Sequence, residues 1–138
     1  MKQKIIKWHI QGEKKIIHDI KYIMNGSDGL SVILSDFRTN IIQKELDIVI
    51  NFGFNFIAYR ITNEELRAKL YEDLKKDSEF DFKWGFYEVK NSEYVSWLKN
   101  ESYSTIDTNK IIHYSLFDEN YVLDILTTCK PSIQEALL

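Results

Sequence analysis

Alternating apolar and polar side chains dominate the first half of the chain. Residues 16–24 and 30–37 both alternate in this way, on either side of the turn signal Asn25-Gly-Ser-Asp-Gly29. Apolar side chains at every second position turn one face of a strand toward a core, so this pattern predicts a β-hairpin. The same alternation in residues 46–52 and 56–61 predicts two further strands.

From residue 62 the apolar period lengthens from two to nearly four, which is typical of a helix. Thr62-Asn-Glu-Glu65 has the form of a capping box, in which the threonine and the second glutamate satisfy backbone N–H groups at a helix start. Leu66, Leu70 and Leu74 then repeat at every fourth position. A helix is therefore expected from residue 62 to about residue 76.

A strand and a second helix are expected next. Residues 82–89 carry large side chains on both sides of an alternating pattern, which predicts a strand. Asn91 or Ser92 is expected to cap a short helix that ends near Asn100. The polar and aromatic segment 101–109 follows as a loop longer than the usual ~4 to 6 residues, and long loops often carry function.

The last part of the chain is expected to form one more strand and a third helix. Residues 110–116 predict the strand. Asp118 would cap the helix, and Pro131 would end it. The buried stripe of this helix would consist of Val122, Ile125 and Leu126.

These elements together predict an α+β fold, in which an antiparallel or mixed sheet of about six strands has about three helices packed on one face. A chain of 138 residues is long enough for one domain with a core and too short for two domains of usual size. With 44% hydrophobic residues, five glycines and one proline, the composition excludes a disordered or collagen-like chain. Residues 1–138 are therefore expected to form a single domain.

The charge balance and the apolar runs narrow the classes of partner. The chain has 18 Lys and Arg against 21 Asp and Glu, a net charge of -3, which disfavours nucleic acid as a partner. The apolar runs are too short for a signal peptide or a membrane span, so no membrane association is expected. The single cysteine, Cys129, cannot form an internal disulfide. We therefore expect a cytoplasmic protein.

The sequence contains none of the familiar catalytic, metal or cofactor motifs. His9, His18 and His113 are too far apart for the ligand spacings of metal sites. The serine nucleophile elbow, the phosphate-binding loop and the dinucleotide-binding glycine pattern do not occur. We therefore expect no metal, no cofactor and no catalytic residue, and the sequence favours a protein without enzymatic activity.

Acidic and aromatic residues are concentrated between residues 92 and 124. Tyrosine and tryptophan are frequent anchors at protein interfaces, and carboxylates steer a basic partner toward them. We therefore interpret this segment as a binding surface for another protein. The candidate binding residues are Glu93, Tyr94, Trp97, Glu101, Tyr103 and Asp107. The alternative is that some of these rings belong to the core and that the acids form a solvated face.

Several motifs of the chain resemble a family of small uncharacterised bacterial proteins. They are Val89-x-Asn-Ser-x-Tyr-Val-x-Trp-Leu-x-x-Glu-Ser-Tyr103, Ile112-His-Tyr114, and Tyr59-Arg-Ile-Thr-Asn-Glu64 at a strand-to-helix junction. The resemblance covers roughly residues 46–131. Members are similar in size and charge to immunity proteins, which block a toxin by binding it. The resemblance implies a cytosolic inhibitor that neutralises a basic toxin by occlusion, and it supplies no catalytic residues.

Two other functions stay open at this point. A small enzyme could use His113 as a base with Tyr103 or Tyr114 as its partner, and this hypothesis predicts a pocket that holds His113. A structural homodimer could form through the aromatic strand Phe82–Val89.

Overall fold

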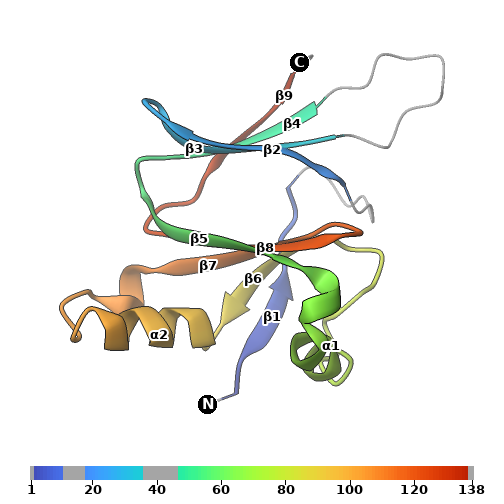
Figure 1. The fold of residues 1–138 in the computed structure, drawn as a ribbon, viewed down its shortest axis with the longest axis vertical. Coiled ribbons are helices and arrows are strands. Elements are labelled where there is room, and N and C mark those ends of the chain that lie inside the picture. Colours follow the sequence, from blue (N-terminus) through green and yellow to red (C-terminus); the bar gives the residue numbers. More distant parts are fainter. Residues whose placement is uncertain (1, 11–17, 36–46, 137–138) are drawn as a thin grey trace.

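The computed structural model describes residues 2–10, 18–35 and 47–136 (Figure 1). In these ranges the chain forms nine strands, two α-helices and two short 3-10 helices. The strands are β1 (Lys4–Lys7), β2 (Ile20–Gly26), β3 (Gly29–Leu34), β4 (Asp47–Gly53), β5 (Phe56–Asn63), β6 (Phe86–Lys90), β7 (Ile112–Phe117), β8 (Tyr121–Thr127) and β9 (Ser132–Ala136). The helices are η1 (Glu64–Leu66), α1 (Ala68–Leu74), α2 (Glu93–Glu101) and η2 (Thr108–Lys110).

The strands form two antiparallel sheets. One sheet has five strands in the order β1-β6-β7-β8-β5, and the other has four in the order β2-β3-β4-β9. Figure 1 shows the sheets as two stacked layers, with α1 and α2 on the side of the five-stranded sheet that faces away from the four-stranded sheet. The described chain is therefore a two-layer β-structure with helices on one outer face.

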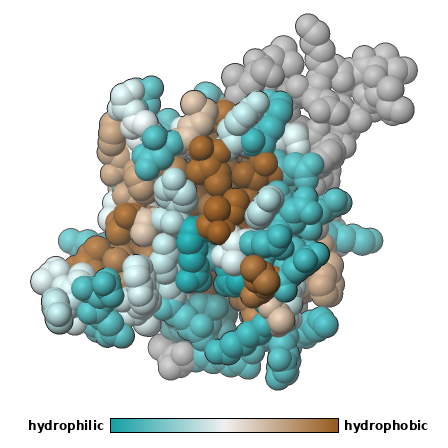
Figure 2. Space-filling view, viewed as in Figure 1, coloured by the Kyte–Doolittle hydropathy of each residue, from teal (hydrophilic) through white to brown (hydrophobic). Residues whose placement is uncertain are grey.

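The hydrophobic core lies between the two layers. In the four-stranded sheet, the register places Val32 of β3 opposite Ile50 of β4, and neither side chain is exposed. Tyr114 of β7 meets Phe52 of β4 across the layers, with 6.1 Å between ring centroids. Burying a large apolar side chain contributes about 1.5–3 kcal/mol, so this layer contact is a main source of stability. Figure 2, which has the same viewpoint as Figure 1, shows hydrophobic side chains gathered near the middle of the surface that faces the viewer.

The outer face of the five-stranded sheet is also covered. Phe117 of β7 contacts Tyr71 of α1, with 6.1 Å between ring centroids, and His113 of β7 contacts Tyr94 of α2, with 5.8 Å. Almost every residue of β7 and β8 is therefore buried, whichever face of the sheet it lies on.

The predicted fold class, an α+β sheet of about six strands with about three helices, is wrong. Residues 121–127, expected in the third helix, form strand β8 between β7 and β5, and Pro131 precedes strand β9. Because β8 is buried on both faces, its apolar residues do not alternate with polar ones. Their spacing instead imitates the stripe of an amphipathic helix. Strands therefore replace the third helix and outnumber the predicted ones.

Most of the strands predicted in the first half are confirmed. The hairpin is present because β2 and β3 pair antiparallel, and the strands predicted over residues 46–52 and 56–61 are present as β4 and β5. The parts of these predicted strands in residues 16–17, 36–37 and 46 lie outside the described residues.

Strand β6 begins later than predicted and lies inside the sheet. Residues 82–85 are not part of the strand, and the N–H of Trp84 donates to the carbonyl of Asp81 at 2.9 Å. β6 is hydrogen-bonded to β1 on one side and to β7 on the other. An edge-to-edge homodimer through Phe82–Val89 would therefore have to displace one of these strands.

Candidate functional site

Three polar side chains lie on the buried outer face of β7 and β8. Ser115 is directly opposite Asp124 in the register of these strands, and His113 lies two residues before Ser115 on the same face. The exposed fractions are 3% for His113, 4% for Ser115 and 2% for Asp124. Buried polar groups need hydrogen-bond partners, so the surroundings of these residues decide whether the cluster is stable.

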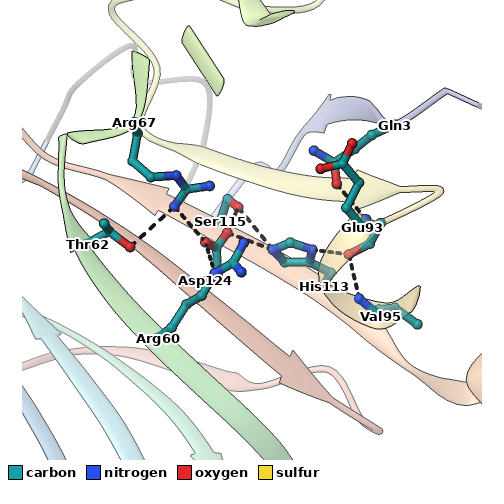
Figure 3. A network of polar contacts seen from close by, with 10 residues as sticks. Gln3, Arg60, Thr62, Arg67, Glu93, Val95, His113, Ser115 and Asp124 are labelled. Atoms are coloured by element: carbon teal, nitrogen blue, oxygen red, sulfur yellow. Dashed lines mark hydrogen bonds and ion pairs between the residues drawn. The ribbon is translucent and has the colours of Figure 1, made fainter. Parts of the chain in front are cut away.

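A network of hydrogen bonds and ion pairs supplies the partners (Figure 3). At Oδ1 of Asp124, the Nε2 atom of His113 lies 2.7 Å away and the Oγ atom of Ser115 donates a short hydrogen bond. At Oδ2, Arg60 donates from Nε at 3.0 Å and Arg67 donates from Nη1 at 3.3 Å. Asp124 is therefore the centre on which these side chains converge.

The two arginines reach Asp124 from different elements. Arg60 lies opposite Asp124 in the β5–β8 register, and its Cζ atom lies 4.2 Å from the centre of the Tyr94 ring of α2. Arg67 lies between η1 and α1, and its Nη1 atom also donates to Oγ1 of Thr62 at 3.4 Å. Stacking and ion pairing thus hold both guanidinium groups in place.

The helix predicted over residues 62–76 is shorter than expected, because the chain leaves helical geometry at Arg67. The structure has the turn η1, then Arg67 with φ -109° and ψ 37°, then the short helix α1. Asn63 caps the first turn by accepting a hydrogen bond from the N–H of Glu65 at 3.0 Å. Thr62 belongs to β5 and bonds Arg67, so the expected capping box does not form.

Ser92 holds the other side of the His113 ring. Its Oγ atom lies 2.6 Å from Nδ1 of His113, and it accepts a hydrogen bond from the N–H of Val95 at 3.1 Å, so it caps α2 as predicted. The ionised carboxylate of Asp124 can only accept, so Nε2 of His113 carries a hydrogen and donates it to Asp124. With that hydrogen on Nε2 of a neutral ring, Nδ1 accepts a hydrogen bond from the hydroxyl of Ser92.

Asp124 keeps its negative charge well into acid. Burial by itself would raise the pKa of this carboxyl group, but the hydrogen bonds from His113 and Ser115 and the positive charge of Arg60 outweigh that effect. The pKa of Asp124 is therefore lowered below the ordinary value for aspartate. Asp124 is therefore a permanently charged hydrogen-bond acceptor in this network at neutral pH, and it does not serve as a proton donor.

The fold is expected to lose stability in acid through this group. A carboxyl group whose pKa is lower in the folded chain contributes its full stability above its unfolded pKa, about 4, and loses it as the pH falls through the folded pKa. Between about pH 5 and pH 2, the free energy of unfolding should therefore fall more steeply for the wild type than for Asp124→Asn. Urea denaturation at several pH values measures both slopes, with Asp107→Asn as the exposed control. Equal slopes for wild type and Asp124→Asn would show that the pKa of Asp124 is not lowered.

The network lines a cavity of about 350 Å³. Arg60, Arg67 and Asp124 all contribute to its wall, as do His113 and Ser115. The lining residues that this cavity shares with a neighbouring cavity between β1 and α1 include Asp73 and Glu93. The charged network therefore lies on the side of the cavity away from that neighbour.

The pocket that the enzyme alternative predicts at His113 is present, but the structure does not bring the expected tyrosines to it. Tyr114 follows His113 on β7, so it faces the opposite side of the sheet and belongs to the core. Tyr103 is in the loop after α2 and is 92% exposed. Ser92, His113 and Asp124 are bonded in a row, but Ser92 is buried and its Oγ is engaged as a helix cap. Among the described residues we find no nucleophile that shares the cavity with a free base.

The surface that the sequence predicts for a partner is largely exposed. Trp97 is 52% exposed in α2, and Tyr103 extends from the end of that helix. Glu93, Glu101 and Asp107 are exposed. These five residues thus keep the exposure that a contact with another protein requires.

Tyr94, the sixth predicted binding residue, is 6% exposed and is not a surface anchor. Its ring lies against the guanidinium group of Arg60 and meets His113 edge-on. The inner face of α2 turns this ring toward the sheet, where it packs on the network. Tyr94 therefore supports the arginine site instead of the outer surface.

Sequence reasoning missed four members of the network, Arg60, Arg67, Ser115 and Asp124. One signal was present: Asp124 is the single charged residue in the otherwise largely apolar segment 121–127, and a buried carboxylate requires partners. The partners themselves come from other elements, and Arg60 is 64 positions away in sequence. Local patterns could not have named them.

No helix of the described ranges has the length and hydrophobicity of a membrane-crossing segment. The same residues contain no group of three or more His, Cys, Asp or Glu side chains placed to hold a metal ion. A scan against protein-family models, a search of curated proteins and a search of solved structures each found no significant match. The family resemblance is therefore a prediction that rests on the sequence motifs alone.

Proposed function

We propose that this protein binds another protein through the end of α2 and the loop after it, and that it acts as an immunity-like inhibitor that occludes a toxin. The observation that carries the proposal is Tyr103. Its side chain is 92% exposed while its backbone has the left-handed φ of 50°. A strained backbone under an exposed aromatic ring favours a role in binding over a role in packing.

Tyr103 occupies a position that strongly prefers glycine. The N–H of Tyr103 donates to the carbonyl of Asn100 at 3.1 Å, and the N–H of Ser104 donates to the carbonyl of Lys99 at 2.8 Å. These two bonds form a Schellman motif, in which the residue at the Tyr103 position is left-handed and is usually glycine. A residue with a Cβ atom costs about 1 kcal/mol there. The exposed ring of Tyr103 offers no packing that would offset this cost.

The neighbours of Tyr103 indicate the chemistry of the partner. Trp97 supplies a second exposed ring on α2, and the carboxylates of Glu93, Glu101 and Asp107 are exposed around it. Aromatic rings that lose water at the centre of a contact can supply affinity, while carboxylates at the rim attract a basic surface. A basic toxin is the partner that this combination fits best. Inhibition then needs only that the bound domain covers the working surface of the toxin.

Tyr103→Gly is expected to stabilise the protein and weaken the complex at the same time. Glycine relieves the left-handed strain, so the free energy of unfolding should rise by about 0.5–1 kcal/mol. Immunity proteins are encoded beside the toxins that they block, so the partner to test is the product of the adjacent gene. Loss of the ring should weaken binding to that product by at least about tenfold, the scale of an interface anchor. Urea denaturation measures the first effect and isothermal titration calorimetry the second.

Tyr22→Ala is the matched control for this experiment. Tyr22 is also exposed, but it lies on β2 of the four-stranded sheet, so its loss should leave the affinity unchanged. The proposal is wrong if the wild type forms no complex with that gene product, or if Tyr103→Gly binds it as tightly as the wild type does. A stabilised variant that has lost affinity would identify Tyr103 as a residue kept for binding.

A further inference from the structure

We propose that the cavity beside Asp124 binds a carboxylate group, held by Arg60 and Arg67. This site is distinct from the exposed rings of Trp97 and Tyr103, although Glu93 belongs to both regions, and it does not depend on the function proposed for those rings. The inference rests on the geometry of the two guanidinium groups, the local charge and the size of the cavity.

Two contacts hold the side chain of Arg60, and neither of them involves its terminal nitrogens as hydrogen-bond donors. Its Nε atom is bonded to Asp124, and its planar face lies against Tyr94. Within the described ranges, neither terminal nitrogen of Arg60 has a hydrogen-bond partner from the protein. An arginine whose plane is fixed by stacking and by one ion pair presents a rigid fork of N–H donors, which matches the two oxygens of a carboxylate.

Arg67 completes the pair from the junction between η1 and α1, and it donates to the same oxygen of Asp124 as Arg60 does. Only its Nη1 atom is engaged, by Asp124 and by Thr62, so Nε and Nη2 are left as donors in the part of the chain that the structure describes. The side chain of Arg67 is only 19% exposed. An arginine that is mostly removed from water with unused donors benefits strongly from an added acceptor.

The Asp124 contacts themselves are not those of an optimal structural ion pair. Each arginine approaches Oδ2 through a single nitrogen, whereas the strongest arginine–aspartate pairs use two parallel N–H···O bonds. Oδ1 is already bonded by His113 and Ser115. Asp124 therefore needs fewer than two guanidinium groups for its own satisfaction, and its role toward them is to orient them.

The charge at this side of the cavity selects a monoanion. Asp124 is ionised, so two guanidinium groups against one carboxylate leave a local surplus of one positive charge. Asp73 and Glu93 also line the cavity, with Lys69 as a further cation, so no larger positive field exists there to hold a dianion. A single carboxylate matches the surplus and a phosphate dianion exceeds it.

The size of the cavity limits the ligand. A volume of about 350 Å³ is at the lower end of the ~300–1,000 Å³ typical of small-molecule sites. It can admit a small carboxylic acid, or the acidic side chain of a protein partner that covers the opening. Both ligands present the same planar carboxylate to the arginines.

The test is a titration of the isolated protein with the monoanions sodium acetate and sodium butyrate, observed through the Arg Nε–H signals in NMR. We expect saturable shifts of the Arg60 and Arg67 signals, with sodium chloride at equal ionic strength as the blank. Arg60→Lys and Arg67→Lys keep the charge and lose the fork, so each should weaken binding by at least about tenfold. Lys69→Gln removes a charge from the same cavity wall without touching the network, and it should change the affinity by less than about threefold.

Two further arms identify the source of the carboxylate. Tighter binding of butyrate than of a capped Gly-Gly-Glu-Gly-Gly peptide, which also carries one carboxylate, would assign the site to small acids, and the reverse order would assign it to an acidic side chain. Tighter binding of inorganic phosphate than of any carboxylate would overturn the proposal, as would equal losses in Lys69→Gln and in the arginine variants.

Folding of the variants does not limit the outcome. Circular dichroism shows whether Arg60→Lys and Arg67→Lys are folded. If either variant is unfolded, the titration of the wild type decides whether the cavity binds a carboxylate. Absence of saturable shifts in wild type up to about 100 mM carboxylate would end the proposal. The partner experiment with Tyr103→Gly is independent, because it uses a different surface and a different ligand.

Discussion

Asp124→Ala is expected to lower the free energy of unfolding by about 3–5 kcal/mol, which is the usual cost of removing one partner from a buried ion pair. The variant leaves the Nε2 hydrogen of His113 and the hydroxyl of Ser115 without their acceptor. It also leaves the guanidinium groups of Arg60 and Arg67 beside each other with no carboxylate between them. Unsatisfied donors and like charges in a partly buried place both destabilise the fold.

Asp107→Ala provides the matched control, because Asp107 is exposed and, among the described residues, its carboxylate accepts only a cap bond from the N–H of Asn109. Its loss should cost less than about 1.5 kcal/mol. Urea denaturation at neutral pH measures both variants. A cost below about 1 kcal/mol for Asp124→Ala would mean that the network adds little to stability.

Gly29→Ala is expected to cost about 3 kcal/mol or more, because two penalties act together. A Cβ atom at Gly29 would overlap the carbonyl carbon of Gly53, which is a backbone atom and cannot turn aside. Gly29 also has a φ of +86°, which side chains with a Cβ atom rarely adopt. The variant must therefore separate β3 from β4 at this point or distort the hairpin.

Gly26→Ala is the control within the same hairpin. Gly26 pairs with Gly29 next to the loop of Ser27 and Asp28, and a Cβ atom on Gly26 meets nothing within 4 Å. Its effect on the free energy of unfolding should stay within about 0.5 kcal/mol. Thermal or urea unfolding of the two variants measures the difference. Similar stabilities for Gly26→Ala and Gly29→Ala would contradict the close approach of Gly29 to Gly53.

The features that could be predicted from the sequence are those with a local cause. The turn residues 25–29 favour a hairpin by themselves, and Ser92 can cap α2 because the donor that its Oγ accepts from, the N–H of Val95, is three residues away. Strand β4 shows alternation because Ile48, Ile50 and Phe52 belong to the core, while Val49 and Asn51 between them are more exposed. Each of these signals is complete within a few neighbouring positions.

The errors have the opposite origin. The sequence pattern predicts a helix for segment 121–127 because it does not reveal that β8 is covered on both faces, by the helices on one side and by the second sheet on the other. The sequence predicts Tyr94 as a surface anchor because the burial of its ring depends on distant parts of the chain, the sheet beneath α2 and Arg60 from β5. In both cases the missing information is which distant element lies alongside.

By itself, the sequence determined the hairpin, the capped helix after residue 92, most strands of the first half and the exposed aromatic and acidic positions around Tyr103. Only the tertiary structure decided that the molecule has two sheets, and that Asp124 gathers Arg60, Arg67, His113 and Ser115 beside a cavity. The physical reason is the range of the interactions. Turns and caps are satisfied by near neighbours in the chain, whereas burial on two faces and pairing of buried charges depend on segments that folding alone brings together.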